Sequence, residues 1–77
     1  MTFPLRQLQY LCVLAETGSY HTAARKLYIT QPTLSIAIKK LEESLGVPLF
    51  LRDGRSVTPT PEGELVLAYA RKILDLD

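Results

Sequence analysis

The sequence predicts a mainly helical domain that carries one short β-hairpin near its C-terminal end and finishes in a further helix. Three observations support this fold class. Apolar residues recur every three or four positions in four separate stretches, as on the buried face of an α-helix. Ser or Thr, which cap helix N-termini, precedes each of the last three stretches. Between the third and fourth stretches, two short runs flank Asp53-Gly54, a pair that favours a tight hairpin turn.

The length of the chain limits it to one small folding unit. It has 77 residues, of which 47% are hydrophobic and 22% charged, an ordinary composition for a globular domain. No apolar run approaches the roughly 18 residues that a membrane-spanning helix needs, and no secretory signal peptide is visible. A single cysteine, Cys12, forms no disulfide within the chain and is consistent with a reducing cytoplasm, where we expect the protein to reside.

The first two helices are separated by a glycine. We expect the first over residues 4–17, with Gly18 ending it, and the second from the cap Ser19 to about Leu27. The apolar positions that predict the first helix are Leu5, Leu8, Leu11, Cys12 and Ala15. Those that predict the second are Tyr20, Ala23, Ala24 and Leu27.

The third helix is expected over residues 31–45. Thr30 stands where its N-cap is needed, Pro32 lies in the first turn, where a missing N–H costs nothing, and Gly46 ends it. Its apolar stripe comprises Leu34, Ala37, Ile38, Leu41 and Leu45. The short connection to the preceding helix gives the pair the form of a helix-turn-helix.

A hairpin and a last helix complete the chain. We expect strands over residues 49–52 and 55–58, and a helix from Thr60 onward. This helix is apolar on more than one face, so a second surface must cover it; we expect Leu67 and Leu74 to be exposed there. No helix stop follows the last leucine, and we expect the natural chain to continue beyond residue 77.

Charge is distributed unevenly along the chain. Residues 20–58 contain six basic and three acidic side chains, whereas residues 59–77 contain two basic and four acidic ones. A basic middle and an acidic end suit a module that touches phosphate with one part and protein with another, although the formal net charge is only +1.

The predicted order of elements is that of a winged helix-turn-helix, in which the second helix of the pair enters the DNA major groove and the hairpin lies along the backbone. We therefore predict a DNA-binding domain over residues 1–59 and a linker or dimerisation helix over residues 60–77. Polar and methyl-bearing side chains at the tip of helix 31–45 suit hydrogen bonds to phosphates and bases and contacts with thymine methyl groups. The candidate DNA-binding residues are Gln31, Pro32, Thr33, Ser35, Ile36, Lys39, Arg52 and Arg55.

Other interpretations of these residues remain open at this stage. The helix residues could be an ordinary solvated face, and the two arginines could serve to discourage strand pairing. The same fold could also dock a partner protein. One His and one Cys make no zinc site, no Ser/His/Asp arrangement is present, and we expect neither catalysis nor a bound cofactor or metal. Cys12 is expected in the core, and His21 is expected to be solvated or to contact a phosphate.

Many of these residues together resemble the signature of LysR-type transcriptional regulators. The matching segments are Gly18-Ser19-Tyr20, Ala23-Ala24, Leu27, Thr30-Gln31-Pro32-Thr33-Leu34-Ser35, Ile38, Leu41-Glu42, Leu45-Gly46, Leu49-Phe50 with Arg52, and Thr60-Pro61-Glu62-Gly63. The last of these resembles the Thr-x-x-Gly that opens the linker helix of that family. The match covers nearly the whole chain.

The resemblance implies a bacterial regulator that binds a partly palindromic site in double-stranded DNA. It implies a homodimer through the helix of residues 60–77, a tetramer in the longer protein, and a C-terminal domain, absent from this chain, that binds a small-molecule effector. It also implies that Gln31, Pro32, Thr33, Ser35 and the residue at 36 line the major groove. Arg52 and Arg55 would serve the wing, the hairpin of residues 49–58, which lies on the DNA backbone.

The sequence departs from the family pattern at two positions of the predicted groove-facing helix. Arg or Lys is common in the family where this chain has Ile36, and Gln is common where it has Ala37. Reading of guanine at position 36 is therefore not expected. A preference built from methyl contacts and from groove shape is expected instead.

Overall fold

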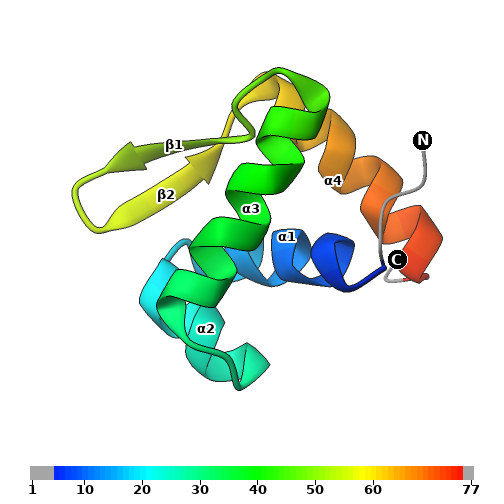
Figure 1. The fold of residues 1–77 in the computed structure, drawn as a ribbon. Coiled ribbons are helices and arrows are strands. Elements are labelled where there is room, and N and C mark those ends of the chain that lie inside the picture. The colour runs from blue at the N-terminus through cyan, green and yellow to red at the C-terminus, as the bar shows by residue number, and fades with distance from the viewer. Residues whose placement is uncertain (1–4, 76–77) are drawn as a thin grey trace.

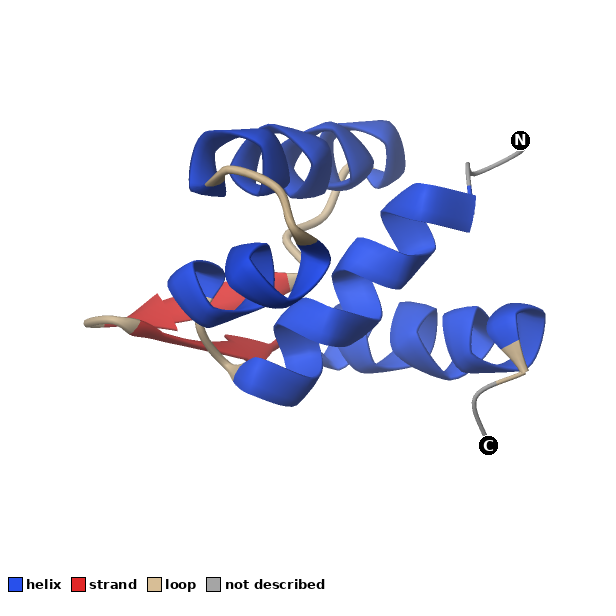
Figure 2. Ribbon diagram, turned by 90° about the horizontal axis from the view of Figure 1, so that it is seen from below, coloured by secondary structure: helices blue, strands red, loops and turns tan. Residues whose placement is uncertain are grey.

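The computed structural model describes residues 5–75 and confirms the predicted fold class, four helices with a two-stranded antiparallel hairpin. The elements are α1 (Leu5–Thr17), α2 (Tyr20–Leu27), α3 (Gln31–Leu45), β1 (Phe50–Asp53), β2 (Ser56–Pro59) and α4 (Pro61–Leu74) (Figure 1). The hairpin projects beyond the body formed by the helices, and a view from below shows the same projection (Figure 2). The predicted start of the first helix at residue 4 lies outside the described residues.

The predicted N-caps are confirmed. Ser19, Thr30 and Thr60 each accept, through the side-chain hydroxyl oxygen, a hydrogen bond from the backbone N–H three residues later, at 3.2, 3.2 and 2.9 Å. Each bond satisfies a donor that the first turn of a helix would otherwise leave unpaired. The predicted stop of α3 is confirmed as well, because Gly46 adopts φ 75° and donates its N–H to the carbonyl of Glu42.

The hydrophobic core lies around α1, which contacts every other helix and β2. Its buried face comprises Leu8, Leu11 and Leu14, spaced three residues apart, with Cys12 beside them. The expectation that Leu5 joins this face is wrong, since its side chain is 57% exposed. Three residues make less than one full turn of an α-helix, so side chains spaced by three shift gradually around it. Leu5 therefore lies at the edge of the buried face.

The hairpin turn lies one residue later than expected. Asp53 pairs with Ser56, so Gly54 and Arg55 form the two-residue loop in place of the predicted Asp53-Gly54. Gly54 has φ 64°, while Arg55 is not among the residues with positive φ, and a Gly at the first central position is the requirement of a type II′ turn. The register is set by burial at the base of the hairpin, which overrides the local preference of the Asp-Gly pair.

The start of α4 is locked to the residues that lead into the hairpin. Thr60 donates its hydroxyl hydrogen to the carbonyl of Pro48 at 2.8 Å, and its backbone N–H donates to the carbonyl of Leu49 at 2.9 Å. Gly63 lies so close to Leu49 that a β-carbon built on it would overlap the Leu49 carbonyl oxygen. Only glycine fits at this contact.

Further along, α4 is apolar on two sides, as the sequence predicts. Leu67 and Ala70 are buried in the core, whereas Leu65, Tyr69 and Ile73 form an exposed row at four-residue spacing. The expectation that Leu67 and Leu74 are exposed on the second surface is therefore wrong. Leu67 is 1% exposed and packs inward, and Leu74 is partly buried against the core. Within residues 5–75, no helix has both the length and the apolar character needed to cross a bilayer.

Replacing Gly63 by Ala should destabilise the chain strongly. The added methyl group must displace the Leu49 backbone or the start of α4, and such overpacking costs about 1–3 kcal/mol. Ala68→Ser, at an exposed position of the same helix, is the control and should lower the free energy of unfolding by no more than about 0.5 kcal/mol. Chemical denaturation of both variants measures the difference. Equal losses would contradict the role given to Gly63.

Candidate nucleic-acid interface

The exposed side of α3 presents the residues that the sequence singles out. Pro32, Ile36 and Lys39 lie at four- and three-residue spacing on its outward face, and all three are exposed. Ile36 is 57% exposed, an unusual position for a large aliphatic side chain on a small domain. This outward face is therefore apolar near the N-terminus of α3 and basic one turn further on.

The N-terminal tip of α3 is tightly ordered. The hydroxyl groups of Thr30 and Thr33 lie 2.7 Å apart and share a hydrogen bond, while the Thr33 N–H donates to the cap. Gln31 is exposed beside them. Ser35 is half-buried on the same side of the helix as Gln31 and Glu42, to judge from the four- and seven-residue spacing. The Thr33 hydroxyl is thus already engaged within the chain, whereas the Gln31 side chain projects from the tip.

Strand alternation decides where the arginine of β1 points. Phe50 and Arg52 lie on one face of β1, and Val57, the partner of Arg52 across the ladder, lies on the same face of the hairpin. Phe50 is 8% and Val57 4% exposed, so this is the face that packs on the helices. Arg52 consequently extends toward α2 and α3, although its own side chain is exposed.

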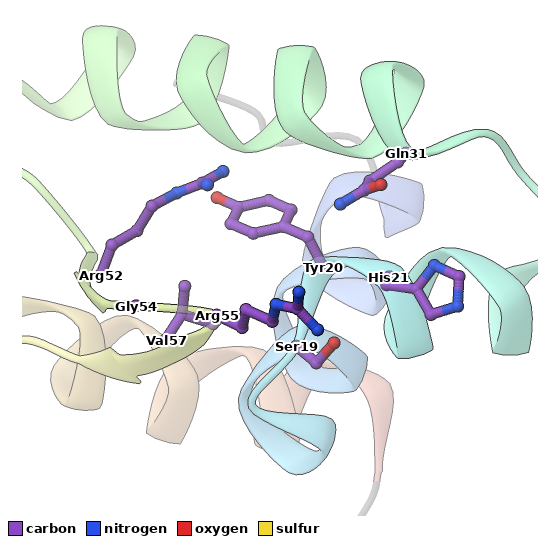
Figure 3. A pocket seen from close by; sticks show the side chains of 8 residues that line it. All are labelled: Ser19, Tyr20, His21, Gln31, Arg52, Gly54, Arg55 and Val57. Atoms are coloured by element: carbon purple, nitrogen blue, oxygen red, sulfur yellow. The ribbon is translucent and has the colours of Figure 1, made fainter.

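A cleft of about 580 Å³ separates the hairpin from the beginnings of α2 and α3. Figure 3 shows Arg52 extending from β1 toward the Tyr20 ring, with Gln31 approaching from α3 and Arg55 extending toward the start of α2. The lining residues are Ser19, Tyr20, His21, Gln31, Arg52, Gly54, Arg55 and Val57. Two guanidinium groups and one side-chain amide therefore border a single cleft, which is a suitable environment for an anion.

At the centre of the cleft, the guanidinium carbon of Arg52 lies 4.6 Å from the centroid of the Tyr20 ring, a cation–π contact. Burial raises the pKa of Tyr20 above its ordinary value and the negative charge of Glu42 raises it further, whereas the positive charge of Arg52 and a hydrogen bond with that side chain oppose both. The phenol therefore stays protonated at neutral pH and can donate a hydrogen bond.

The hairpin is fixed to the helices by backbone hydrogen bonds as well. The Oε2 atom of Glu42 accepts from the N–H groups of Leu49 at 2.7 Å and Phe50 at 3.4 Å. On the other strand, the N–H of Val57 donates to the carbonyl of Gly18 at 2.9 Å. The position of the wing relative to α3 and to the start of α2 is thus defined at its base.

The structure brings some of the candidate residues together and leaves others apart. Gln31, Arg52 and Arg55 meet at the cleft, while Lys39 borders a separate shallow depression that includes Glu43. The other candidates occupy the tip and outward face of α3: Pro32, Thr33, Ser35 and Ile36.

Sequence reasoning did not assign Ser19 or Tyr20 to the site, because both were accounted for as helix-forming residues. The one available signal was their place at the start of a helix that crosses the DNA backbone in helix-turn-helix proteins. The pairing of Tyr20 with Arg52 joins residues far apart in the sequence and leaves no periodic trace.

The one cysteine and the one histidine of the chain lie in different environments. Cys12 is 3% exposed, and burial raises the pKa of its thiol, with a smaller opposing effect from the charge of Arg71 and a small further rise from Glu16. The thiol is therefore protonated and poorly nucleophilic at neutral pH. His21 is exposed at the rim of the cleft. Among residues 5–75, no group of three or more His, Cys, Asp or Glu side chains is placed to hold a metal ion.

A helix-turn-helix with an exposed tip, beside a hairpin that carries two arginines, defines a winged helix-turn-helix DNA-binding domain. The sequence model described as "Bacterial regulatory helix-turn-helix protein, lysR family" matches residues 5–64. The chain belongs to this family, as the resemblance in the sequence predicts.

Individual relatives agree with this assignment. A small neutral protease regulatory protein of Streptomyces coelicolor is 46% identical over 74 residues, which are 96% of this chain but 23% of the relative. The DNA-binding domain of BenM, solved in complex with benA site 1 DNA, has a TM-score of 0.89 at 45% identity, covering 95% of this chain and 85% of that one. An OxyR variant of Corynebacterium glutamicum, solved with H2O2 bound, has a TM-score of 0.91 at 43% identity, covering 99% of this chain and 24% of that one.

Removing the carboxylate of Glu42 should loosen the wing. In Glu42→Ala the N–H of Leu49 loses its acceptor, and a buried donor without a partner costs about 1–3 kcal/mol. Amide hydrogen exchange at Leu49 and Phe50 should accelerate, and the free energy of unfolding should fall. The matched control is Glu43→Ala, at the exposed neighbouring position. If Glu43→Ala accelerates exchange at the same amides equally, the wing is not held through Glu42.

Proposed function

We propose that this chain binds double-stranded DNA, with the tip of α3 in the major groove and the wing on the sugar-phosphate backbone. The observation that carries this proposal is the convergence of Gln31, Arg52 and Arg55 on one cleft. If α3 lies in a major groove and the wing reaches outward beside it, one DNA strand must pass between them. The relative solved with DNA has the same fold at 45% identity, which supports this orientation.

Base contacts are assigned to the tip and the outward face of α3. Gln31 can pair with adenine through its amide, and Pro32 and Ile36 present apolar surface that suits thymine methyl groups. Thr33 and Ser35 have short side chains that let the helix approach the groove closely. Because Ile36 has no hydrogen-bonding group, we expect a modest preference among bases that depends on methyl contacts and on groove shape.

Phosphate contacts are assigned to the three basic residues of the site. Arg52 and Arg55 flank the cleft, and Lys39 lies one turn beyond Ile36 on α3, where a long side chain can reach the backbone across the groove. Each neutralised phosphate releases counterions, so affinity should fall steeply as salt concentration rises.

Pairing of two copies is assigned to the exposed row of α4. Leu65 is 73%, Tyr69 53% and Ile73 47% exposed, and a row of this kind on a small domain is suited to burial against another helix. A two-fold pair of antiparallel helices would place two α3 tips on one face of DNA and favour a partly palindromic site. In this proposal residues 60–77 begin the linker helix, beyond the DNA-binding unit of residues 1–59, and Leu67 and Ala70 of this segment also complete the core.

The chain spans about a quarter of the length of the curated relative described above, so the wider activity of the protein is also a proposal. A small-molecule effector would bind to residues beyond those of this chain, and we assign no cofactor to the chain itself. Pairs of dimers would form tetramers in the longer protein. Its site of action would be the bacterial cytoplasm, where the DNA lies.

Selection of bound fragments from a random duplex library tests the proposal directly. Enrichment of a common, partly palindromic sequence, with an affinity that falls steeply between low and high salt, is the expected result. No enrichment, or binding indifferent to salt, would contradict DNA binding and favour the alternative of a winged helix that docks a protein.

Two substitutions should separate backbone contacts from base contacts. Arg52→Ala should weaken binding to all duplexes and reduce the slope of log affinity against log salt by about 1. Ile36→Ala should leave that slope unchanged and cost roughly 1–2 kcal/mol on the selected duplex alone, because it removes apolar contacts. Fluorescence anisotropy titrations over a range of salt concentrations measure both effects. An Ile36→Ala chain that binds the selected duplex as tightly as the parent does would refute the methyl-contact assignment.

Polar substitution of the exposed row should prevent pairing. The double change of Leu65 and Ile73 to Ser should convert a dimer of the chain to a monomer without loss of fold, since neither side chain belongs to the core. Leu51→Ser, at a position on the wing that is 58% exposed, is the matched control and should leave the dimer intact. Sedimentation equilibrium distinguishes the two, and an unchanged dimer in the double variant would locate the interface elsewhere.

A further inference from the structure

The flexibility of the Arg52 side chain opposes its use in DNA binding. An arginine on a projecting hairpin has several rotatable bonds, and fixing them on binding reduces affinity. In this chain the guanidinium group already has a defined place, 4.6 Å from the centroid of the Tyr20 ring. The free protein therefore restrains the side chain before any DNA is present.

Tyr20 is a rigid support for this contact. Its side chain has only two principal rotatable bonds, and the ring is partly buried against the hydrophobic core. Its backbone begins α2 directly after the cap Ser19, whose side chain is bonded to the N–H of Thr22. The loop before it is tied to the wing through Gly18 and Val57. The Tyr20 ring and the wing are therefore held in a fixed position relative to one another.

An aromatic ring holds a guanidinium group without neutralising it. A carboxylate in the same place would form an ion pair and reduce the positive charge available to a phosphate. The ring face leaves the charge uncompensated, and the hydrogen bond with the Tyr20 hydroxyl engages only part of the five N–H donors of a guanidinium group. Figure 3 shows the Arg52 side chain reaching across the cleft toward the ring, with Gln31 of α3 approaching from the other side. The guanidinium group is therefore held at the cleft that the hairpin shares with the tip of α3.

We propose that Tyr20 is a positioning residue for DNA binding, and that its ring holds Arg52 over the cleft so that the wing and the tip of α3 engage the same DNA strand. The proposal rests on the proposed function and deepens it. Tyr20 acts through Arg52, and the ring is the part that acts. The phenol hydroxyl, which shares a hydrogen bond with Arg52, makes the smaller contribution.

A double-mutant cycle between Tyr20 and Arg52 tests the proposal, with the duplex selected from the random library as the probe. Tyr20→Leu should weaken binding about two- to fivefold, the range expected for loss of a cation–π contact. The same change made in the Arg52→Ala chain should have no further effect. Tyr20→Phe, which keeps the ring, should bind within about twofold of the parent chain.

Tyr10→Leu is the matched control, because Tyr10 is also partly buried against the core but lies on α1 and outside the cleft. It should lower the thermal midpoint about as much as Tyr20→Leu does while leaving DNA affinity unchanged. A second measurement needs no variant that must fold: in the free parent chain, the Cδ protons of Arg52 should show an upfield ring-current shift in NMR spectra.

Three outcomes would overturn the proposal. These are equal effects of Tyr20→Leu with and without Arg52, a loss in Tyr20→Phe as large as that in Tyr20→Leu, and an unshifted Arg52 signal in the free chain. Each is distinct from failure of the proposed function, which would appear as the absence of salt-dependent DNA binding by the parent chain itself.

Discussion

The backbone of Leu49 is held from two sides, and the rest of the site depends on that constraint. Glu42 of α3 accepts a hydrogen bond from its N–H, and Thr60 before α4 donates to its carbonyl oxygen. Gly63 lets α4 approach the same peptide more closely than any other residue would permit. Because the hairpin begins immediately after Leu49, these contacts set the direction in which the wing leaves the helices, together with the hydrogen bond from Val57 to Gly18 on the other strand.

Features controlled by local chemistry could be predicted from the sequence, and features controlled by distant packing could not. The caps at Ser19, Thr30 and Thr60 are local hydrogen bonds that the residue types predict directly. The hairpin turn was predicted one residue early, because burial at its base outweighs the preference of an Asp-Gly pair. Leu67 was placed on the wrong side of α4, since a helix that is apolar on two faces does not reveal which face meets the core.

The candidate site likewise has a part that the sequence predicts and a part that it does not. The exposed residues of α3 follow from helical spacing, so Gln31 and Ile36 could be selected from the sequence. The cleft depends on how β1 is placed against α2, and the contact between Tyr20 and Arg52 joins two elements with a whole helix between them. No periodic pattern in the sequence indicates such a contact. The place of Arg52 on the predicted hairpin identified the arginine, while its partner became visible only in three dimensions.

The absence of a β-carbon at residue 63 has a consequence beyond stability. It fixes how closely α4 lies against the domain at its first turn, and therefore the angle at which this helix departs. If two copies pair along the exposed row of α4, as proposed above, that angle would determine how far apart their α3 tips stand. The length of DNA between two half-sites would then depend on the contact between Gly63 and Leu49, although neither residue is assigned to the DNA interface.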